Sequence, residues 1–283
     1  MTSLDHKIDF AAVLLVERAN PNGDPLNGNR PRQNFDGYGE ISDVAIKRKI
    51  RNRLQDMGEN IFVQSDSKNT DGFRSLQDRA NSVPELVDAG KAKKKDEDLY
   101  AKIAADTWID VRSFGQVFAF KNDSMSVGVR GPVSIHPAVS ITPININSVQ
   151  ITKSVNSTTS DKKGSDTMGM KHRVDFGLYL LKGSINTQLA EKTGFTNEDA
   201  DKIKEALRTL FVNDASSARP EGSMEVVKLY WWEHNSKLGQ YSSAKVHRSL
   251  QVKALVEDPK TLADFDITVE NIEGLSLVEI DGD

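Results

Sequence analysis

The residues best suited to chemistry lie between positions 20 and 53. They begin with a loop rich in Asn, Gly and Pro, with the sequence Asn20-Pro21-Asn22-Gly23-Asp24-Pro25-Leu26-Asn27-Gly28-Asn29-Arg30-Pro31-Arg32. Farther along, five of seven consecutive positions are basic, namely Lys47, Arg48, Lys49, Arg51 and Arg53. A loop that offers backbone N–H groups beside guanidinium and ammonium groups suits a chain of phosphates. The sequence therefore predicts a phosphate-binding track in this region.

Two familiar loop types do not fit these residues. Gly23 and Gly28 have the glycine spacing of a P-loop, but the Lys-Ser/Thr pair that binds phosphate and magnesium does not follow. A calcium loop that began at Asn20 would place Pro25 at its glycine and Pro31 at its bidentate glutamate. A wide Asn/Gly turn is the structural alternative. The length of the loop, a dozen residues with three prolines, favours a function because it exceeds what a strand-to-helix connection needs.

The apolar spacing predicts a helix from about Ser42, its N-cap, to Met57. Its core stripe comprises Ile46, Ile50, Leu54 and Met57. Only Asp43 and Asp56 balance the five cations within this helix, and Arg48 is expected to point away from the core. A solvated surface helix is the alternative. Like charges on one helix face repel each other unless an anion neutralises them, so we favour phosphate binding.

A second basic zone runs from Lys153 to Arg173 and includes Met168-Gly169-Met170 on a segment that is expected to be flexible. Exposed methionines on such a segment have two interpretations. They either pack onto the body as a hinge, or they act as an apolar wedge that unstacks nucleobases.

Composition excludes several classes of protein. The 283 residues include no cysteine, which rules out disulfides, thiolate zinc sites and cysteine nucleophiles. The five histidines are scattered without metal-ligand spacing, so we expect no metal and no cofactor. The N-terminus lacks the blocks of a signal peptide, and no apolar run approaches the length that spans a bilayer. We therefore expect a cytoplasmic protein with no membrane partner.

The net charge of −4 hides an uneven distribution. From Glu257 to Asp283 there are nine acids against Lys260 alone, so the first 256 residues carry a net charge of +4. A basic body with an acidic tail is compatible with binding a polyanion on one face. The tail has two interpretations. It is either a solvated edge that keeps the protein soluble, or a segment that repels nucleic acid or meets the basic face of a neighbouring copy.

The elements that position these residues indicate a fold of the α+β class. Strands are predicted at Ile8–Val16, Asp110–Phe120, Val174–Leu181 and Val226–Trp232, with bent or edge strands within Met125–Ile146. A second helix is predicted from Thr196, its N-cap, to about Val212. Without insertions, the order of elements is strand, helix, strand, strand, helix, strand. This order predicts an RRM-like or ferredoxin-like domain, an antiparallel four-stranded sheet with two helices on one side. Because such a domain needs roughly 100 residues, we assign the surplus of this single domain to two inserted segments and a C-terminal extension at 235–283.

Four motifs occur in a specific order and spacing along the chain: Asn20-Pro21-Asn22-Gly23-Asp24-Pro25 after the opening strand, Asp43-Val44-Ala45-Ile46-Lys47-Arg48-Lys49-Ile50-Arg51, Asp110-Val111-Arg112-Ser113-Phe114-Gly115, and Gly131-Pro132-Val133. With them the chain resembles, over nearly its whole length, the repeated backbone subunit of type I-C Cascade. That complex is the CRISPR surveillance complex, and the subunit is a member of the RAMP superfamily.

The resemblance implies a non-catalytic protein with an RRM-like palm, inserted fingers at 65–107 and a thumb at 144–174. It implies a homo-oligomer whose copies stack head to tail along a guide RNA (crRNA), together with other Cascade subunits. Each thumb would flip a base out at regular intervals, and the free segments of the guide would pair with a target DNA strand. The protein would read the shape and backbone of the RNA, while base pairing reads sequence.

The resemblance also implies roles for individual residues. The expected RNA-binding residues are Asn20, Asn22, Arg30, Arg32, Lys47, Arg48, Lys49, Arg51, Arg53, Arg112, Ser113, Phe114 and Gln116. The expected thumb residues are Met168, Met170, Lys171, His172 and Arg173, with the two methionines as wedge candidates.

Two alternatives remain beside the scaffold. Related backbone subunits of other CRISPR types cut target RNA with an aspartate in the loop after the first strand, a part that Asp24 or Asp36 could take here. The sequence places no partner acid or histidine to complete such a site, so we favour the scaffold. The other alternative is a protein that binds small anions, whose affinity would not depend on RNA length.

Overall fold

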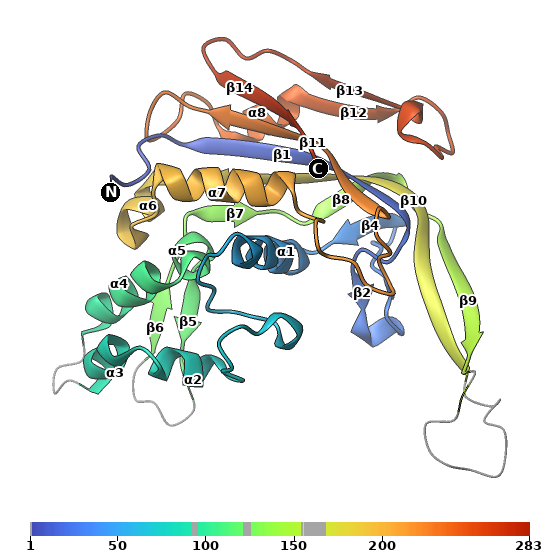
Figure 1. Ribbon diagram of the computed structural model, residues 1–283. Helices are drawn as coiled ribbons and strands as arrows, with labels where there is room; N and C mark the ends of the chain where they lie inside the picture. Colours follow the sequence, from blue (N-terminus) through green and yellow to red (C-terminus); the bar gives the residue numbers. More distant parts are fainter. Residues whose placement is uncertain (1, 92–95, 121–125, 154, 156–167) are drawn as a thin grey trace.

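The chain folds around one large antiparallel β-sheet (Figure 1). The computed structural model describes residues 2–91, 96–120, 126–153, 155 and 168–283. Within these residues the sheet has eight strands, and six of them lie in the order β14-β11-β1-β10-β8-β4, while β7 and β9 also pair with β10. Their bounds are β1 Ile8–Ala19, β4 Tyr38–Ile41, β7 Val133–Ile135, β8 Ala138–Pro143, β9 Ile146–Thr152, β10 Met168–Ile185, β11 Met224–Glu233 and β14 Ser276–Asp281.

The predicted α+β class and the antiparallel sheet are confirmed, but the prediction of four strands is wrong. The central strand β1 is apolar on both faces because both faces of the sheet are covered. The strand β14 extends the sheet beyond β11, and β4 extends it beyond β8. Both additions are short, and β14 is largely exposed, so neither carries the dense apolar pattern that marks a buried strand.

Two helices, α1 (Asp43–Asp56) and α7 (Asn197–Arg208), pack on one face of the sheet. Ser42 caps α1 as predicted, because its Oγ accepts the backbone N–H of Ala45 at 3.3 Å. Thr196 caps α7 in a reciprocal capping box with Asp199. The predicted stripe of α1 is also confirmed: Ile46, Ile50 and Leu54 are buried in the core, and Met57 packs against it.

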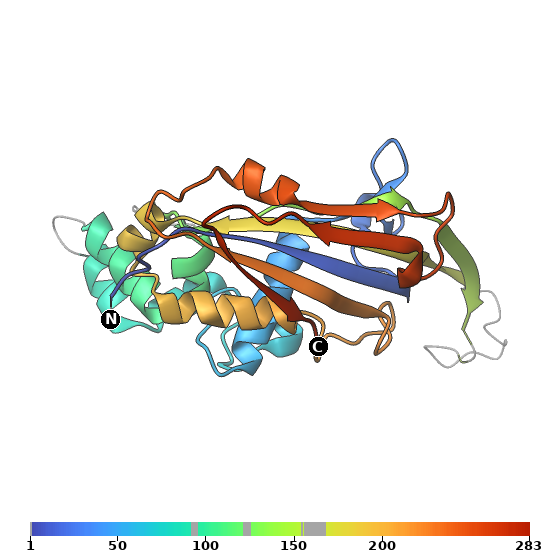
Figure 2. The same ribbon diagram turned by 90° about the horizontal axis from the view of Figure 1, so that it is seen from above.

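The C-terminal segment covers the opposite face of the sheet (Figure 2). Its elements there are α8 (Ser243–Ser249) and the two-stranded sheet of β12 (Leu250–Ala254) and β13 (Phe265–Val269). Val246, Leu250 and Phe265 join Ala11, Val13 and Trp232 of the large sheet in one buried cluster. This face of the sheet is therefore not an open platform.

A helical unit with its own core lies below the sheet in Figure 1. Phe62 lies at its aromatic centre, with its ring centroid 4.7 Å from that of Trp108 and 5.0 Å from that of Phe118. The bounds are α2 Leu76–Asn81, α3 Pro84–Lys91, α4 Glu97–Thr107, α5 Ile109–Phe114, β5 Gln116–Phe118 and β6 Val127–Val129. The prediction of a strand over Asp110–Phe120 is wrong, because its first half is the helix α5 and only 116–118 is strand.

Two projecting features lie at the other end of the molecule (Figure 1). The loop hairpin, residues 20–32, contains β2 (Gly23–Asp24), η1 (Pro25–Asn27) and β3 (Arg30–Pro31). The ribbon consists of β9 and residues 168–174 of β10, which pair in antiparallel register. Met168–Met170 therefore lie on a regular strand rather than on the expected flexible segment, while most of the intervening stretch falls outside the described residues.

Three further elements complete the described chain: η2 (Asp66–Lys68), α6 (Thr187–Thr193) and η3 (Leu262–Asp264). Among the described residues, no helix combines the length and apolar character that crossing a membrane would require.

Candidate nucleic-acid interface

The asparagines of the loop hairpin hold its backbone in shape. Asn20 is buried, and its Nδ2 donates to the carbonyl of Asn29 at 2.7 Å. The Oδ1 of Asn22 accepts the backbone N–H of Ser42 at 2.9 Å, which ties the hairpin to the start of α1. The carboxylate of Asp24 accepts the N–H of Leu26 at 3.1 Å. These side chains fix the hairpin as a rigid projection, so its free groups are presented in a defined geometry.

Two arginines of the loop hairpin are available for a ligand. The Nη1 of Arg30 donates to the Oγ of Ser148 at 2.9 Å and lies 3.5 Å from the Nδ1 of His172, so it joins the hairpin to the ribbon without neutralising its charge. The Nη2 of Arg32 lies 3.8 Å from Asp24, at the limit of an ion pair, and its buried Nε has no hydrogen-bond partner. Both arginines line a hollow of about 290 Å³ on the hairpin.

The helix α1 has most of its cations paired inside the protein. This corrects the expectation that few acids balance them. Two of the partners come from the same helix and two from distant segments, in the pairs Lys47–Asp43, Lys49–Asp214, Arg51–Asp110 and Arg53–Asp56. Protein carboxylates thus relieve the repulsion between like charges, and no phosphate is needed for that purpose.

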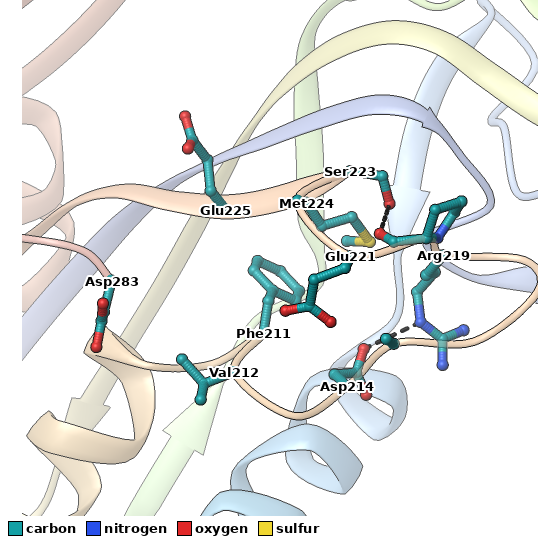
Figure 3. Close-up of a pocket in the computed structure, with 12 residues that line it drawn as sticks. Phe211, Val212, Asp214, Arg219, Glu221, Ser223, Met224, Glu225 and Asp283 are labelled. Carbon is teal, nitrogen blue, oxygen red and sulfur yellow. Dashed lines mark hydrogen bonds and ion pairs between the residues drawn. The ribbon is translucent and has the colours of Figure 1, made fainter.

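Lys49 is the most deeply buried of these cations, with a relative exposure of 5%. Its ammonium pairs with Asp214, which also accepts from Arg219 at 3.0 Å. Burial outweighs the attraction of Asp214 and lowers the pKa of Lys49 to about 8. The neighbouring pocket of about 270 Å³ is lined by carboxylates as well as Arg219 (Figure 3). An acidic pocket of this kind does not suit a polyanion.

Arg51 and Asp110 form a buried ion pair, with Nε and Oδ2 2.8 Å apart. The same carboxylate accepts the backbone N–H groups of Phe62 at 2.7 Å and Val63 at 3.1 Å. Arg51 also lies 5.1 Å from the ring centroid of Phe114, which is half-buried against the core. The pair therefore joins α1, α5 and the segment between them.

Arg48 is half-buried between α1 and the segment that carries Val63. Its Nη1 donates to the carbonyl of Val63, and burial lowers the pKa of the guanidinium. No carboxylate among the described residues forms an ion pair with it, so its charge remains available at the surface between α1 and the helical unit.

The motif at residues 110–115 joins α5 to α7. Arg112 donates from Nε and Nη2 to both oxygens of Asp199 at 2.9 and 2.7 Å, and so connects α5 to the first turn of α7. Ser113 is fully buried. Gln116 donates to the carbonyl of Val117. None of these three side chains has a charge free for a phosphate.

The motifs at residues 110–115 and 131–133 contact each other at Gly115 and Gly131. Gly115 has a φ of +80°, and a Cβ there would lie 2.3 Å from the carbonyl oxygen of Val129. A Cβ on Gly131 would lie 2.3 Å from the carbonyl oxygen of Ser113. The backbones approach so closely that only glycine fits at either position. These motif residues are thus required by packing between the end of α5 and residues 129–131, which follow β6.

The ribbon presents two different faces, because its residues alternate in strand register. Met168, Met170 and His172 share one face with Ser148, the partner of Arg30. Lys171 and Arg173 lie on the other face. The methionines are 61% and 54% exposed. Neither Lys171 nor Arg173 forms an ion pair with any described residue, so their charges are available.

Two exposed residues, Arg18 and Phe35, were not identified from the sequence as candidates for the site. Arg18 has a φ of +50° and lines, with Arg173 and residues of both charges, a cleft of about 730 Å³ at the base of the ribbon. No sequence signal marks it. Phe35 is fully exposed. The sequence feature that could have identified Phe35 is an aromatic residue inside a polar turn, Asn34-Phe35-Asp36-Gly37.

The described residues contain no group of three His, Asp or Glu side chains placed to hold a metal ion. Of the two aspartates considered for RNA cleavage, Asp24 caps η1 and Asp36 is exposed in the turn that follows the loop hairpin.

Comparisons with known proteins agree with the CRISPR resemblance that the sequence motifs indicate. The sequence profile of the family described as "CRISPR-associated protein Cas7" matches residues 6–270. A CRISPR-associated protein Cas7 of Haloferax volcanii is 28% identical over 223 residues, which are 72% of this chain. The match spans only 63% of the length of that relative.

A solved structure shares the fold. A chain of a "CRISPR RNA-guided surveillance complex, pre-nicking" gives a TM-score of 0.50 at 16% identity, over 80% of this chain and 78% of the other. A chain of a "CRISPR RNA-guided surveillance complex" gives a TM-score of 0.48 at the same identity, over 80% of this chain and 68% of the other. The family match extends over nearly the entire sequence, and on that ground the chain belongs to the CRISPR-associated protein Cas7 family.

Proposed function

We propose that the protein is a non-catalytic backbone subunit of a CRISPR surveillance complex of type I-C, and that several copies assemble head to tail along a crRNA. Family membership supports the assignment to such a complex. The observation that carries RNA binding is the distribution of available charge. Arg30, Lys171 and Arg173 lack a carboxylate partner among the described residues, and they lie on the two features that project from the body.

We assign the parts of the chain by their place in the fold. The strands β11, β1, β10 and β7–β8, with α1 and α7, would form an RRM-like palm. The inserted segment 65–107 would belong to the fingers, 144–174 would be the thumb, and 235–283 would be an extension. The strand order and the position of the two helices support this division.

The charge pairing separates two groups among the expected RNA-binding residues. Arg30, Arg32, Lys171 and Arg173 would bind phosphates. Two residues of α1 would join them: Arg48, which has no carboxylate partner among the described residues, and Lys47, whose pair with Asp43 is partly exposed. The others would hold the elements in place: Asn20, Asn22, Lys49, Arg51, Arg53, Arg112, Ser113, Phe114 and Gln116. Met168 and Met170 would act as the wedge that flips a base, since both are exposed on one face of the ribbon. The guide would then be presented for pairing with target DNA.

The salt dependence of RNA binding tests this assignment. Each phosphate contact on a single strand adds roughly 0.7 to the slope of log affinity against log salt concentration. Lys171→Ala should therefore flatten that slope by about 0.7 and weaken binding to all sequences alike. Lys253→Ala is the matched control, because it removes an exposed lysine from β12, which lies on the opposite side of the sheet from α1 and α7. Equal slopes for the two variants would contradict the proposed interface.

Two further measurements address the remaining parts of the proposal. Purification from the host should recover RNA of guide length, and size analysis should show several copies on each RNA. Incubation of the assembled protein with matched RNA and magnesium should leave the RNA intact. Cleavage that Asp24→Ala abolishes would instead establish the ribonuclease alternative.

A further inference from the structure

The side chain of Phe35 is more exposed than any other large apolar side chain in the described chain, at 104%. An aromatic ring that is left in water forgoes the stabilisation that burial would give. Phe35 belongs to none of the three hydrophobic clusters of the fold. Nothing in the folding of this chain therefore accounts for a phenylalanine at this position.

The turn that carries Phe35 is held firmly. The Oδ1 of Asn34 accepts the backbone N–H groups of Asp36 at 3.0 Å and Tyr38 at 2.9 Å. Gln33 donates to the carbonyl of Gly37 at 3.1 Å and to that of Ile144 at 2.9 Å. The second bond ties the turn to the chain just before the ribbon. The backbone at Phe35 is thus fixed, and the ring is presented without the entropic cost of ordering a loop.

The surroundings of Phe35 are polar and charged. Its neighbour Asn34 lines the hollow of the loop hairpin, together with Arg30 and Arg32. Two carboxylates, Asp24 and Glu40, line the same hollow, so the hollow has no net charge. Apart from Pro31, the residues that line this hollow are polar or charged, so it offers little to an apolar protein segment. A nucleotide strand fits better, because it offers a flat π face to the ring and phosphates to the arginines.

We propose that Phe35 is a base-stacking platform on which one nucleobase of the bound single strand lies, while Arg30 and Arg32 contact the adjoining phosphates. This rests on the RNA-binding function proposed above and adds to it a contact with a base outside the ribbon. Stacking on a single ring is tolerant of sequence, since every base has a π face. Phe35 therefore contributes affinity without selecting a base.

The test uses the full-length protein and single-stranded oligoribonucleotides, together with an oligomer of the same length that has abasic riboses throughout. Phe35→Ala should weaken binding to RNA by roughly 5- to 150-fold. Phe35→Leu should weaken it similarly, whereas Phe35→Trp should retain affinity. The loss should vanish with the abasic oligomer. The slope against salt should not change, because no phosphate contact is removed.

Fluorescence gives a second readout. The native tryptophans, Trp108, Trp231 and Trp232, are all buried. An exposed Trp at position 35 should therefore add emission that RNA quenches and the abasic oligomer does not. Leu238→Ala, which removes another exposed apolar side chain, is the control and should bind RNA like the native protein.

Three outcomes would overturn the inference. If native protein binds RNA and Phe35→Ala binds it equally well, the stacking role is wrong while the proposed function stands. If Phe35→Ala changes the oligomeric state without RNA and leaves affinity for a short RNA intact, the ring belongs to a protein interface. If native protein binds no RNA even at low salt, the proposed function fails and the stacking role fails with it.

Discussion

Replacing Arg51 by methionine should destabilise the fold instead of acting mainly on RNA. Arg51→Met keeps an unbranched side chain of similar length but removes the charge. It leaves the carboxylate of Asp110, which is 1% exposed, without its cationic partner. We therefore expect the free energy of unfolding to fall substantially, and the affinity of the folded variant for RNA to change little.

The magnitude follows from the burial of the pair. Removal of one partner from a buried ion pair costs about 3–5 kcal/mol, because the other charge remains uncompensated. The backbone N–H groups of Phe62 and Val63 still bind Asp110, so the lower end of this range, about 3 kcal/mol, is expected. For a chain of this size that corresponds to a decrease in Tm on the order of 6 °C.

Urea unfolding followed by circular dichroism measures the effect. Lys47→Met is the matched control, since it removes a charge from the same helix but breaks a pair whose partners are 26% and 35% exposed. That pair should contribute less than about 1 kcal/mol. Adding Asp110→Asn to Arg51→Met should recover part of the loss, because the unpaired charge is removed.

The reasoning would be refuted by a specific pair of results. If Arg51→Met were as stable as Lys47→Met, the Arg51–Asp110 pair would not hold the fold together. If it also flattened the salt dependence of RNA binding as Lys171→Ala is expected to do, Arg51 would be a phosphate contact, and the division of the cations by their pairing would be wrong.

Two further predictions concern packing and pH. Gly115→Ala should lower the free energy of unfolding in urea by several kcal/mol more than Gly72→Ala does. Both glycines have a φ near +80°, but only Gly115 has backbone atoms within 3 Å of the added Cβ. Equal losses for the two variants would show that the backbone at Gly115 has room for a Cβ. Burial lowers the pKa of Lys49 to about 8, so above that pH the folded protein loses a proton that the unfolded chain keeps. The native free energy of unfolding, measured relative to Lys49→Met, should therefore rise between about pH 8 and pH 10, and a flat difference across this window would show that the lysine stays charged in the fold.

The helix α1 could be predicted from the sequence because its signals are local. Ser42, the apolar spacing and the residues past Met57 lie within a few turns of one another. The partners of its cations could not be predicted. Asp110 is 59 residues from Arg51 and Asp214 is 165 residues from Lys49. A count of charges along one segment does not reveal carboxylates that the fold brings from elsewhere.

The prediction of a strand at α5 failed because the contacts that favour the helix come from distant residues. The six residues of this helix include Ile109, Val111 and Phe114, which favour strands when judged alone. The structure makes a short helix because Asp110 then accepts two backbone N–H groups and Arg112 reaches Asp199. Gly115 ends the helix with its positive φ. Tertiary hydrogen bonds outweigh the intrinsic preference here, and no local pattern records them.

The proposed interface rests on the cations that have no carboxylate partner among the described residues, and not on the density of basic residues in the sequence. The segment with the highest density of basic residues, α1, has most of its cations occupied by carboxylates at 3.3 Å or less. Arg30, Lys171 and Arg173 are fewer and scattered in sequence, yet the pairing of β9 with β10 and the contact of Arg30 with Ser148 bring them to one end of the molecule. A phosphate gains most from a cation that has no competing acid, because it need not displace one. The loop hairpin and the ribbon, more than the basic helix, are therefore where a polyanion should bind.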